Sequence, residues 1–192
     1  MWQPRNIKDV KNVLGMRRTA PPVPEPAQQS DVCVLRFAGL SFSLSGYGPT
    51  SYCTYTYNGT TQIETISPTF TRQIDEGTDV ILSGTLIHVE VLSLNCIYCA
   101  AGNTLSQIEF NAGTNLQVLD LRNLNSGIGF IKIFPPNNLR TIYASDYYWT
   151  NVAQFINESV FSDGVLFISV GSAGYATLAA TAQVKGWQIV NL

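Results

Sequence analysis

The stretch Leu116-Gln-Val-Leu-Asp-Leu-Arg-Asn123 decides the expected fold. It has the form L-x-x-L-x-L-x-N, in which Leu116, Leu119 and Leu121 are spaced to enter one core. The amide of Asn123 is suited to hydrogen-bond the backbone at a sharp corner. A single stretch of this kind cannot bury its apolar face alone, so the pattern predicts that further copies stack on it.

The same apolar frame recurs in copies that begin at residues 89, 139, 165 and 187. The middle apolar residues of the five copies fall at 92, 119, 142, 168 and 190, so the spacings are 27, 23, 26 and 22 residues. These values match or approach the period of leucine-rich repeats, about 20–29 residues. We therefore expect residues 86–192 to form a short, irregular leucine-rich-repeat-like solenoid.

Residues 31–85 have a different period. Apolar residues alternate with their neighbours at Cys33, Leu35 and Phe37, and Asn58-Gly59 is a strong signal for a tight hairpin turn. Further strands are expected at 51–57, 60–66, 70–74 and 80–82. This region is predicted to be antiparallel β structure, which either caps the solenoid or forms a small β-sandwich.

Two helices are expected near the C-terminus. Thr150 or Asn151 can cap the first, which would bury Val152, Phe155, Ile156 and Val160. Ser172 can cap the second, with Gly186 as its C-terminal stop. The predicted fold class is therefore mainly β with some α.

Residues 1–30 precede this body as an extended arm in two parts. Residues 1–18 have apolar positions spaced for one face of a short helix, too short to be stable alone, and they predict a basic amphipathic anchor peptide. The anchor residues are Ile7, Lys8, Val10, Lys11, Val13, Leu14, Arg17 and Arg18. Residues 19–30 are rich in proline and predict an extended linker.

The net charge of −2 hides an asymmetry. Residues 1–20 hold five basic residues and one acidic residue, whereas residues 31–192 hold six basic and eleven acidic residues. A basic arm on an acidic body suggests docking on another protein, and the alternative is a solvated tail. The basic residues are too sparse to predict a nucleic-acid partner.

The sequence shows no sign of a membrane span or of a secretion signal. No apolar run approaches the roughly 20 residues that a spanning helix requires. The start Met1-Trp-Gln-Pro-Arg5 lacks the features of a signal peptide. We expect a chain that is used inside a cell or released by lysis.

Catalytic chemistry is not predicted. His88 is the only histidine and reads as a strand residue, and no nucleophile motif occurs. Cys96 and Cys99 have a C-x₂-C spacing, but Cys33 and Cys53 are too far apart to form the second pair of a zinc site. We expect buried free thiols, no metal, no cofactor and no enzyme, and leave a Cys33–Cys53 disulfide open.

A ligand is expected on the sheet face, where residues between the core leucines point outward. The frame places Ser93, Asp120, Tyr143, Ser169 and Asn191 in one column, and Asp120 is expected to matter little for folding. The candidate ligand or partner residues are Asp120, Arg122, Tyr143, Tyr147 and Trp149. Aromatic rings beside charged groups suit a sugar or a partner's loop, and the alternatives are a solvated column or a contact with a second copy.

The run Phe70–Gly84, the irregular L-x-x-L-x-L copies and the closing Lys185-Gly-Trp-x-Ile189 resemble the BspA-like leucine-rich-repeat proteins of gut Bacteroidetes and their phages. The resemblance covers residues 69–192 and implies a non-enzymatic adhesion or interaction module. The absence of a signal peptide fits the phage members better than the bacterial ones.

The expected function is therefore that of a bacteriophage virion component, of the head-fibre or capsid-decoration type. We expect a homo-oligomer, anchored to other virion proteins through residues 1–30 and assembled in the host cytoplasm. The alternative is a leucine-rich-repeat adhesion module at a cell surface or outside the cell, which binds a host-surface glycan or protein.

Overall fold

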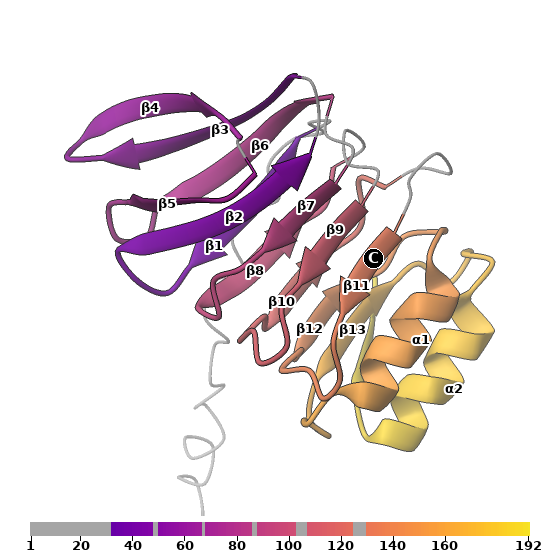
Figure 1. Cartoon of the computed structure of the whole chain (residues 1–192). Coiled ribbons are helices and arrows are strands. Elements are labelled where there is room, and N and C mark those ends of the chain that lie inside the picture. The colour runs from indigo at the N-terminus through magenta and orange to yellow at the C-terminus, as the bar shows by residue number, and fades with distance from the viewer. Residues whose placement is uncertain (1–31, 48–49, 67, 86–87, 103–106, 125–129) are drawn as a thin grey trace, which may run out of the picture.

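The computed structural model describes residues 32–47, 50–66, 68–85, 88–102, 107–124 and 130–192. Within these residues the chain forms a nine-stranded sheet, a five-stranded sheet and two helices, so the expected mainly β fold with some α is confirmed. The two sheets pack against each other, and the helices lie beyond the five-stranded sheet, at the C-terminal end of that layer (Figure 1).

The strand order of each sheet follows from backbone pairing. The nine-stranded sheet runs β14 (Gln188–Asn191), β13 (Val165–Ile168), β12 (Thr141–Tyr143), β10 (Val118–Asp120), β8 (Cys96–Ala100), β1 (Cys33–Phe37), β6 (Asp79–Thr85), β3 (Thr50–Tyr57) and β4 (Thr60–Thr65). The five-stranded sheet runs β11 (Phe130–Ile133), β9 (Gln107–Phe110), β7 (His88–Val91), β2 (Ser41–Tyr47) and β5 (Phe70–Gln73). The helices are α1 (Trp149–Glu158) and α2 (Tyr175–Lys185).

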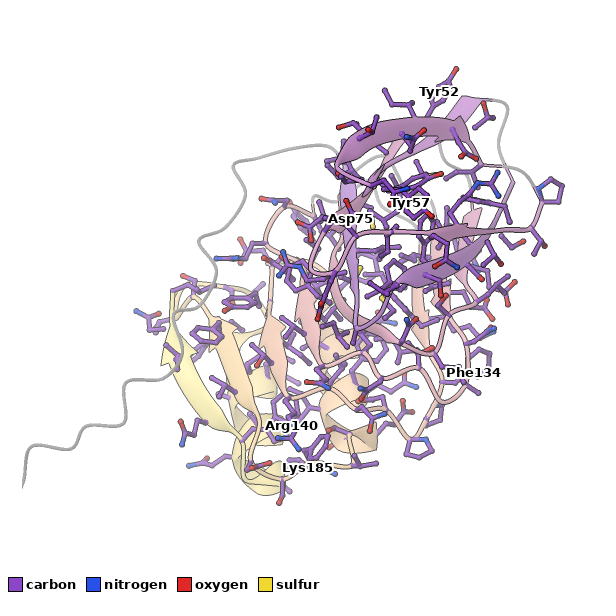
Figure 2. The ribbon with its side chains drawn as sticks, turned by 90° about the vertical axis from the view of Figure 1, so that its left-hand side faces the viewer. Tyr52, Tyr57, Asp75, Phe134, Arg140 and Lys185 are labelled. Carbon is purple, nitrogen blue, oxygen red and sulfur yellow. The ribbon has the colours of Figure 1, made fainter. Side chains whose placement is uncertain are left out.

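The first six strands confirm the antiparallel strands predicted within residues 31–85. Asn58 and Gly59 form the tight turn between β3 and β4, with φ angles of 51° and 69°. The carboxylate of Asp75 accepts the N–H groups of both residues at 2.8 Å, and it lies at the hairpin end of the molecule (Figure 2). This carboxylate holds the turn in its left-handed conformation.

From β7 onward the chain passes between the two layers in a regular way. Strands β8, β10, β12, β13 and β14 are parallel neighbours in one layer. Strands β7, β9 and β11 are parallel neighbours in the other, and α1 and α2 take the place of a strand in the last two passes. Each pass therefore contributes one strand to the nine-stranded sheet.

The register of these passes corrects the predicted repeat frame. The core-facing residues that align are the buried Cys99, Leu119, Ile142 and Leu166 and the partly buried Ile189, with spacings of 20, 23, 24 and 23 residues. The frame at Leu119 and Ile142 is right, whereas Ile168 and Val190 are shifted from the row. Apolar residues fill several alternating positions in these strands, so the sequence fits more than one alignment, and only the pairing selects one.

The first predicted copy is also wrong. Val89 lies in β7 of the other sheet, and Leu94 is 54% exposed instead of buried. The equivalent positions of the first pass are Cys96, Cys99 and Ala101, all of which are buried. This copy could not be recognised in the sequence, because its core positions hold cysteine and alanine, whereas the predicted frame was based on leucine.

Both helices begin without the predicted side-chain caps. Tyr148 occupies the cap position of α1 with a φ of 66°, and Thr150 and Asn151 lie inside the helix. Gly174 precedes α2 and Ser172 makes no capping bond. The chain enters each helix directly from a short turn, so packing rather than capping sets the start.

The buried faces of the helices largely follow the sequence. The residues that α1 and α2 bury are Val152, Phe155, Ile156, Leu178 and Ala182. Val160, which was expected inside, follows the end of α1 and is 55% exposed. Gly186 ends α2 in the left-handed conformation, as predicted, with a φ of 87°.

One hydrophobic core runs between the layers from Cys33 to Trp187. At its N-terminal end the ring of Phe42 contacts Phe37, Tyr55 and Phe70, with centroid separations of 5.2 to 5.8 Å. At the other end Trp187 is buried and its indole N–H donates to the carbonyl of Phe161 at 2.9 Å. Burying each large apolar side chain contributes about 1.5–3 kcal/mol.

In the described part of the chain, neither helix is long and apolar enough to cross a membrane.

Candidate functional site

One row of side chains crosses all strands of the nine-stranded sheet on its outer face. Backbone pairing sets these residues side by side from β4 to β14. The row consists of Ile63, Thr54, Ile81, Val34, Ala100, Asp120, Tyr143, Phe167 and Val190. Most members are apolar, although the face lies outside the core, and such a surface is suited to contact with another molecule.

Asp120 and Arg122 form a charged pair on this face. The guanidinium of Arg122 donates to the Asp120 carboxylate from Nε at 3.0 Å and from Nη2 at 2.6 Å, and the Arg122 backbone N–H donates at 3.1 Å. Asp120 is only 6% exposed, so the carboxylate depends on this partner, which argues against the expectation that Asp120 matters little for folding. The bond with Asp120 raises the pKa of Arg122 above its ordinary value.

Tyr143 is enclosed between two neighbours. The guanidinium carbon of Arg122 lies 4.2 Å from the centre of the Tyr143 ring, and Phe167 stacks at 4.4 Å with an interplanar angle of 13°. Burial raises the pKa of the Tyr143 hydroxyl. Because its neighbours occupy the ring, Tyr143 is not a platform on which a sugar ring can stack.

A second cation lies further along the same face. Arg36 donates to Asp79 from Nε at 2.7 Å and from Nη2 at 3.1 Å, and its guanidinium lies 5.3 Å from the centre of the Tyr98 ring. Burial and the negative charge of Asp120 raise the pKa of Tyr98 to about 12. The hydroxyl of Tyr98 is therefore neutral near pH 7 and serves the face as a polar but uncharged group.

A polar hollow of about 350 Å³ lies at the carboxyl ends of the parallel strands. Its walls come from the segments that follow β10, β12, β13 and β14. The lining residues are Arg122, Leu124, Ala144, Ser145, Asp146, Tyr147, Ser169, Ser172 and Leu192. The carboxyl edge of a parallel sheet is a common position for ligand sites, because successive loops meet there.

The groups in the hollow are chemically varied. Tyr147 and Asp146 are exposed, and the Ser145 hydroxyl both accepts from the Tyr147 N–H at 3.2 Å and donates to the Tyr147 carbonyl at 3.0 Å. The Ser172 hydroxyl oxygen is buried and has no hydrogen-bond partner among the described residues. The hollow therefore offers a carboxylate, a guanidinium, hydroxyl groups and an aromatic ring to one ligand.

The predicted ligand residues divide into two groups. Asp120, Arg122 and Tyr143 are brought into direct contact, and Tyr147 joins Arg122 in the wall of the hollow. Trp149 does not line it, because it begins α1 and packs against Gly174.

The predicted outward column is wrong except at its centre. Pairing aligns Asp120 and Tyr143 with Phe167 and Val190, not with Ser169 and Asn191. Ser93 lies outside the sheet, where its hydroxyl accepts from the Ser43 N–H at 2.6 Å. These differences have the same origin as the shifted frame of the core residues.

Phe167, Tyr98 and Arg36 were missed by sequence reasoning. A signal existed for Phe167, since it alternates with the buried residues Leu166 and Ile168. Tyr98 gives no comparable signal, because it lies between Cys96 and Cys99, whose C-x₂-C spacing is typical of metal sites.

The anchor residues predicted between Ile7 and Arg18, and the linker at 19–30, lie outside the described residues. The side chain of His88 is also outside them.

The four cysteines are buried free thiols, as predicted. Cys33 and Cys53 pair with the same residue, Leu82, from opposite sides of β6, so two strand spacings of about 4.8 Å separate them. The resulting separation exceeds the limit of roughly 7 Å between the Cα atoms of a disulfide, so a Cys33–Cys53 disulfide is excluded. Burial raises the pKa of Cys53 to about 11, and an unreactive thiol follows.

The described residues contain no group of three or more His, Cys, Asp or Glu side chains placed to hold a metal ion.

No protein-family model, no curated protein and no solved structure matches this chain. The resemblance to BspA-like proteins therefore stays a prediction.

Proposed function

We propose that this chain is a non-enzymatic interaction protein built on a leucine-rich-repeat-like solenoid. The spacings of 20 to 24 residues between aligned core positions support the solenoid, because they lie in the range of that repeat class. In this proposal, the antiparallel strands β1 to β6 cap its N-terminal end.

The hollow at the carboxyl ends of the parallel strands carries the functional proposal. It combines the exposed ring of Tyr147 with the carboxylate of Asp146 and the guanidinium of Arg122. We infer that its ligand is a sugar residue of a surface glycan. Sugar hydroxyls pair with carboxylates, guanidinium groups and serines, and an exposed aromatic ring covers the apolar face of the sugar.

A non-enzymatic role is favoured by the state of the hydroxyls in the hollow. Ser145 is engaged with the backbone of Tyr147, and the Ser172 hydroxyl is bonded to no base among the described residues. A nucleophilic serine needs a base within hydrogen-bond reach.

The experiment is a glycan-array screen of the full chain, followed by titration of any glycan retained. The double variant Asp146→Asn with Tyr147→Ala should lose at least about tenfold in affinity. Tyr57→Ala is the matched control, because Tyr57 and Tyr147 are both 41% exposed while Tyr57 lies at the hairpin end (Figure 2). Equal affinity of the wild type and the folded double variant would refute the site.

A second candidate role is that of a virion component of the head-fibre or capsid-decoration type. The observation that favours it is the charge split between the arm, with five basic residues among residues 1–20, and the acidic body. Deleting residues 1–20 should leave the thermal unfolding of the body unchanged and abolish incorporation into the parent assembly. Normal incorporation of the truncated chain would contradict the anchor.

A further inference from the structure

Strand β14 differs from the other edge strands of the two sheets. In the described part of the chain it is one of the two edge strands of the nine-stranded sheet, and β4 is the other. The other three edge strands each carry a charged side chain, Glu64 in β4, Arg72 in β5 and Lys132 in β11. Charges on an edge oppose pairing with another strand, and β14 has none.

Among the strands that the structure describes, β14 pairs with β13 only, so the other side of its backbone faces no described strand. Gln188 and Leu192 direct their N–H groups to carbonyls of Gly164 and Ile168 on the β13 side. Because successive residues of a strand alternate, Ile189 and Asn191 direct their N–H and C=O groups away from β13. These four groups match what another strand would require.

The surroundings of β14 favour a partner with the same surface. From Ser172 to the C-terminal residue of the sequence, Lys185 is the only charged side chain. Its ammonium donates to the carbonyl of Asn157 at the end of α1, at 3.1 Å. Two copies can therefore bring this segment together without opposing like charges, whereas the segment offers nothing to attract a charged partner.

We propose that two copies of this chain associate through antiparallel pairing of their β14 strands about a two-fold axis at Val190. Ile189 of one copy then faces Asn191 of the other, which gives four backbone hydrogen bonds across the axis. The two Val190 side chains meet in the close, non-hydrogen-bonded position. The contact is isologous and closes after two copies, so it forms a dimer and not a filament.

The dimer would join the outer faces of the two nine-stranded sheets. Val190 follows Phe167 in the row that crosses the sheet, so the row would continue through the axis into the second copy. An edge contact of this kind buries less than a standard interface of about 1,600 Å². We expect a reversible dimer, with a dissociation constant on the order of 10–100 μM.

The test is sedimentation velocity of the full chain over about a hundredfold range of concentration around that value. Val190→Lys sets two ammonium groups beside each other at the axis and should weaken the dimer at least tenfold. Val190 is 38% exposed, so the lysine can reach solvent and the monomer should stay folded. The matched control is Ile63→Lys on β4, the opposite edge strand, where the side chain is 68% exposed and association should not change.

Amide hydrogen exchange gives a second measurement that does not depend on a variant. The Ile189 and Asn191 amides should exchange slowly at high concentration and fast at low concentration. Protection at every concentration would mean that another segment of the same chain pairs with β14, and would overturn the proposal. A chain that stays monomeric, or a dimer that Val190→Lys leaves intact, would overturn it as well. None of these outcomes depends on glycan binding.

Discussion

The guanidinium of Arg122 lies 4.2 Å above the ring of Tyr143 while it also binds the carboxylate of Asp120. Arg122 is therefore not a free surface cation. Its charge is balanced, its plane is fixed by two neighbours, and it lines the hollow in a set position. A ligand in the hollow would meet a guanidinium that is already oriented, so little conformational entropy would be lost on binding.

Replacing Arg122 should destabilise the fold although the side chain is at the surface. Arg122→Ala would leave the buried Asp120 carboxylate without its partner, and we expect a loss of about 2–3 kcal/mol in the free energy of unfolding. Urea denaturation measures this loss. The double variant Asp120→Ala with Arg122→Ala should lose less than the sum of the single variants. Strict additivity would show that the pair does not act as a unit.

Leu119→Ala tests the aligned core row. Leu119 is fully buried between Cys99 and Ile142, and its truncation should cost about 2–5 kcal/mol. Val118→Ala is the neighbouring control, because Val118 points to the outer face and is only partly buried. Its cost should be about 1 kcal/mol or less. Similar shifts in thermal unfolding for both variants would mean that the assigned faces are wrong.

Stability at the hairpin should fall in acid through Glu64. Arg72, which donates from Nε at 2.7 Å, and the Tyr55 hydroxyl, which donates at 2.5 Å, lower the pKa of Glu64 below its ordinary value of 4.5. The carboxylate therefore stabilises the fold fully above about pH 4.5, and this contribution is lost as the pH falls through the lowered pKa.

Thermal unfolding at about pH 7 and about pH 3 measures the effect. Glu64→Gln should lower the free energy of unfolding at neutral pH by about 0.5–1 kcal/mol, a small loss because the ion pair is partly solvated. It should also reduce the difference in stability between about pH 7 and about pH 3. Glu76→Gln, in an exposed turn, is the control. An unchanged pH dependence in Glu64→Gln would exclude this carboxylate as a source of acid sensitivity.

Gly164→Ala should disturb the last pass of the chain. A Cβ atom at this position would lie 2.4 Å from the Trp187 ring, so the indole would have to move. We expect a loss of about 1–3 kcal/mol and a shift in tryptophan emission. At Gly171 an added Cβ would meet nothing within 4 Å, and Gly171→Ala should be neutral within about 0.5 kcal/mol. Equal stabilities of the two variants would contradict the packing of Trp187.

The sequence predicted local structure well where a short pattern is compatible with only one local structure. The alternation at Cys33, Leu35 and Phe37, the Asn58-Gly59 turn and the Gly186 stop are all confirmed. Each of these depends on a preference of the local backbone or on a period of two residues. Such preferences act over a few residues and need no knowledge of the partner strand.

The sequence could not predict which strand lies in which layer. Val89 and Val91 in β7 alternate in the same way as residues of the other sheet, and the choice depends on pairing with distant strands. The predicted register was wrong at Ile168 and Val190 for the same reason. The candidate site was predicted in part, because Asp120 ends a recognised strand and Arg122 and Tyr147 follow recognised strands. The hollow itself exists only once several loops meet.

The hydrogen bonds from the hairpin turn to Asp75 also affect the chemical stability of Asn58. Asn-Gly pairs deamidate when the glycine backbone nitrogen attacks the asparagine side-chain amide and forms a succinimide ring. Here the Gly59 N–H is bonded to Asp75 Oδ2, and the turn fixes the backbone of Asn58. The carboxylate therefore keeps the attacking nitrogen occupied for as long as the hairpin is folded. Asp75, 17 positions further along the chain, would thus slow the deamidation of Asn58, although Asn-Gly is the dipeptide most prone to this reaction.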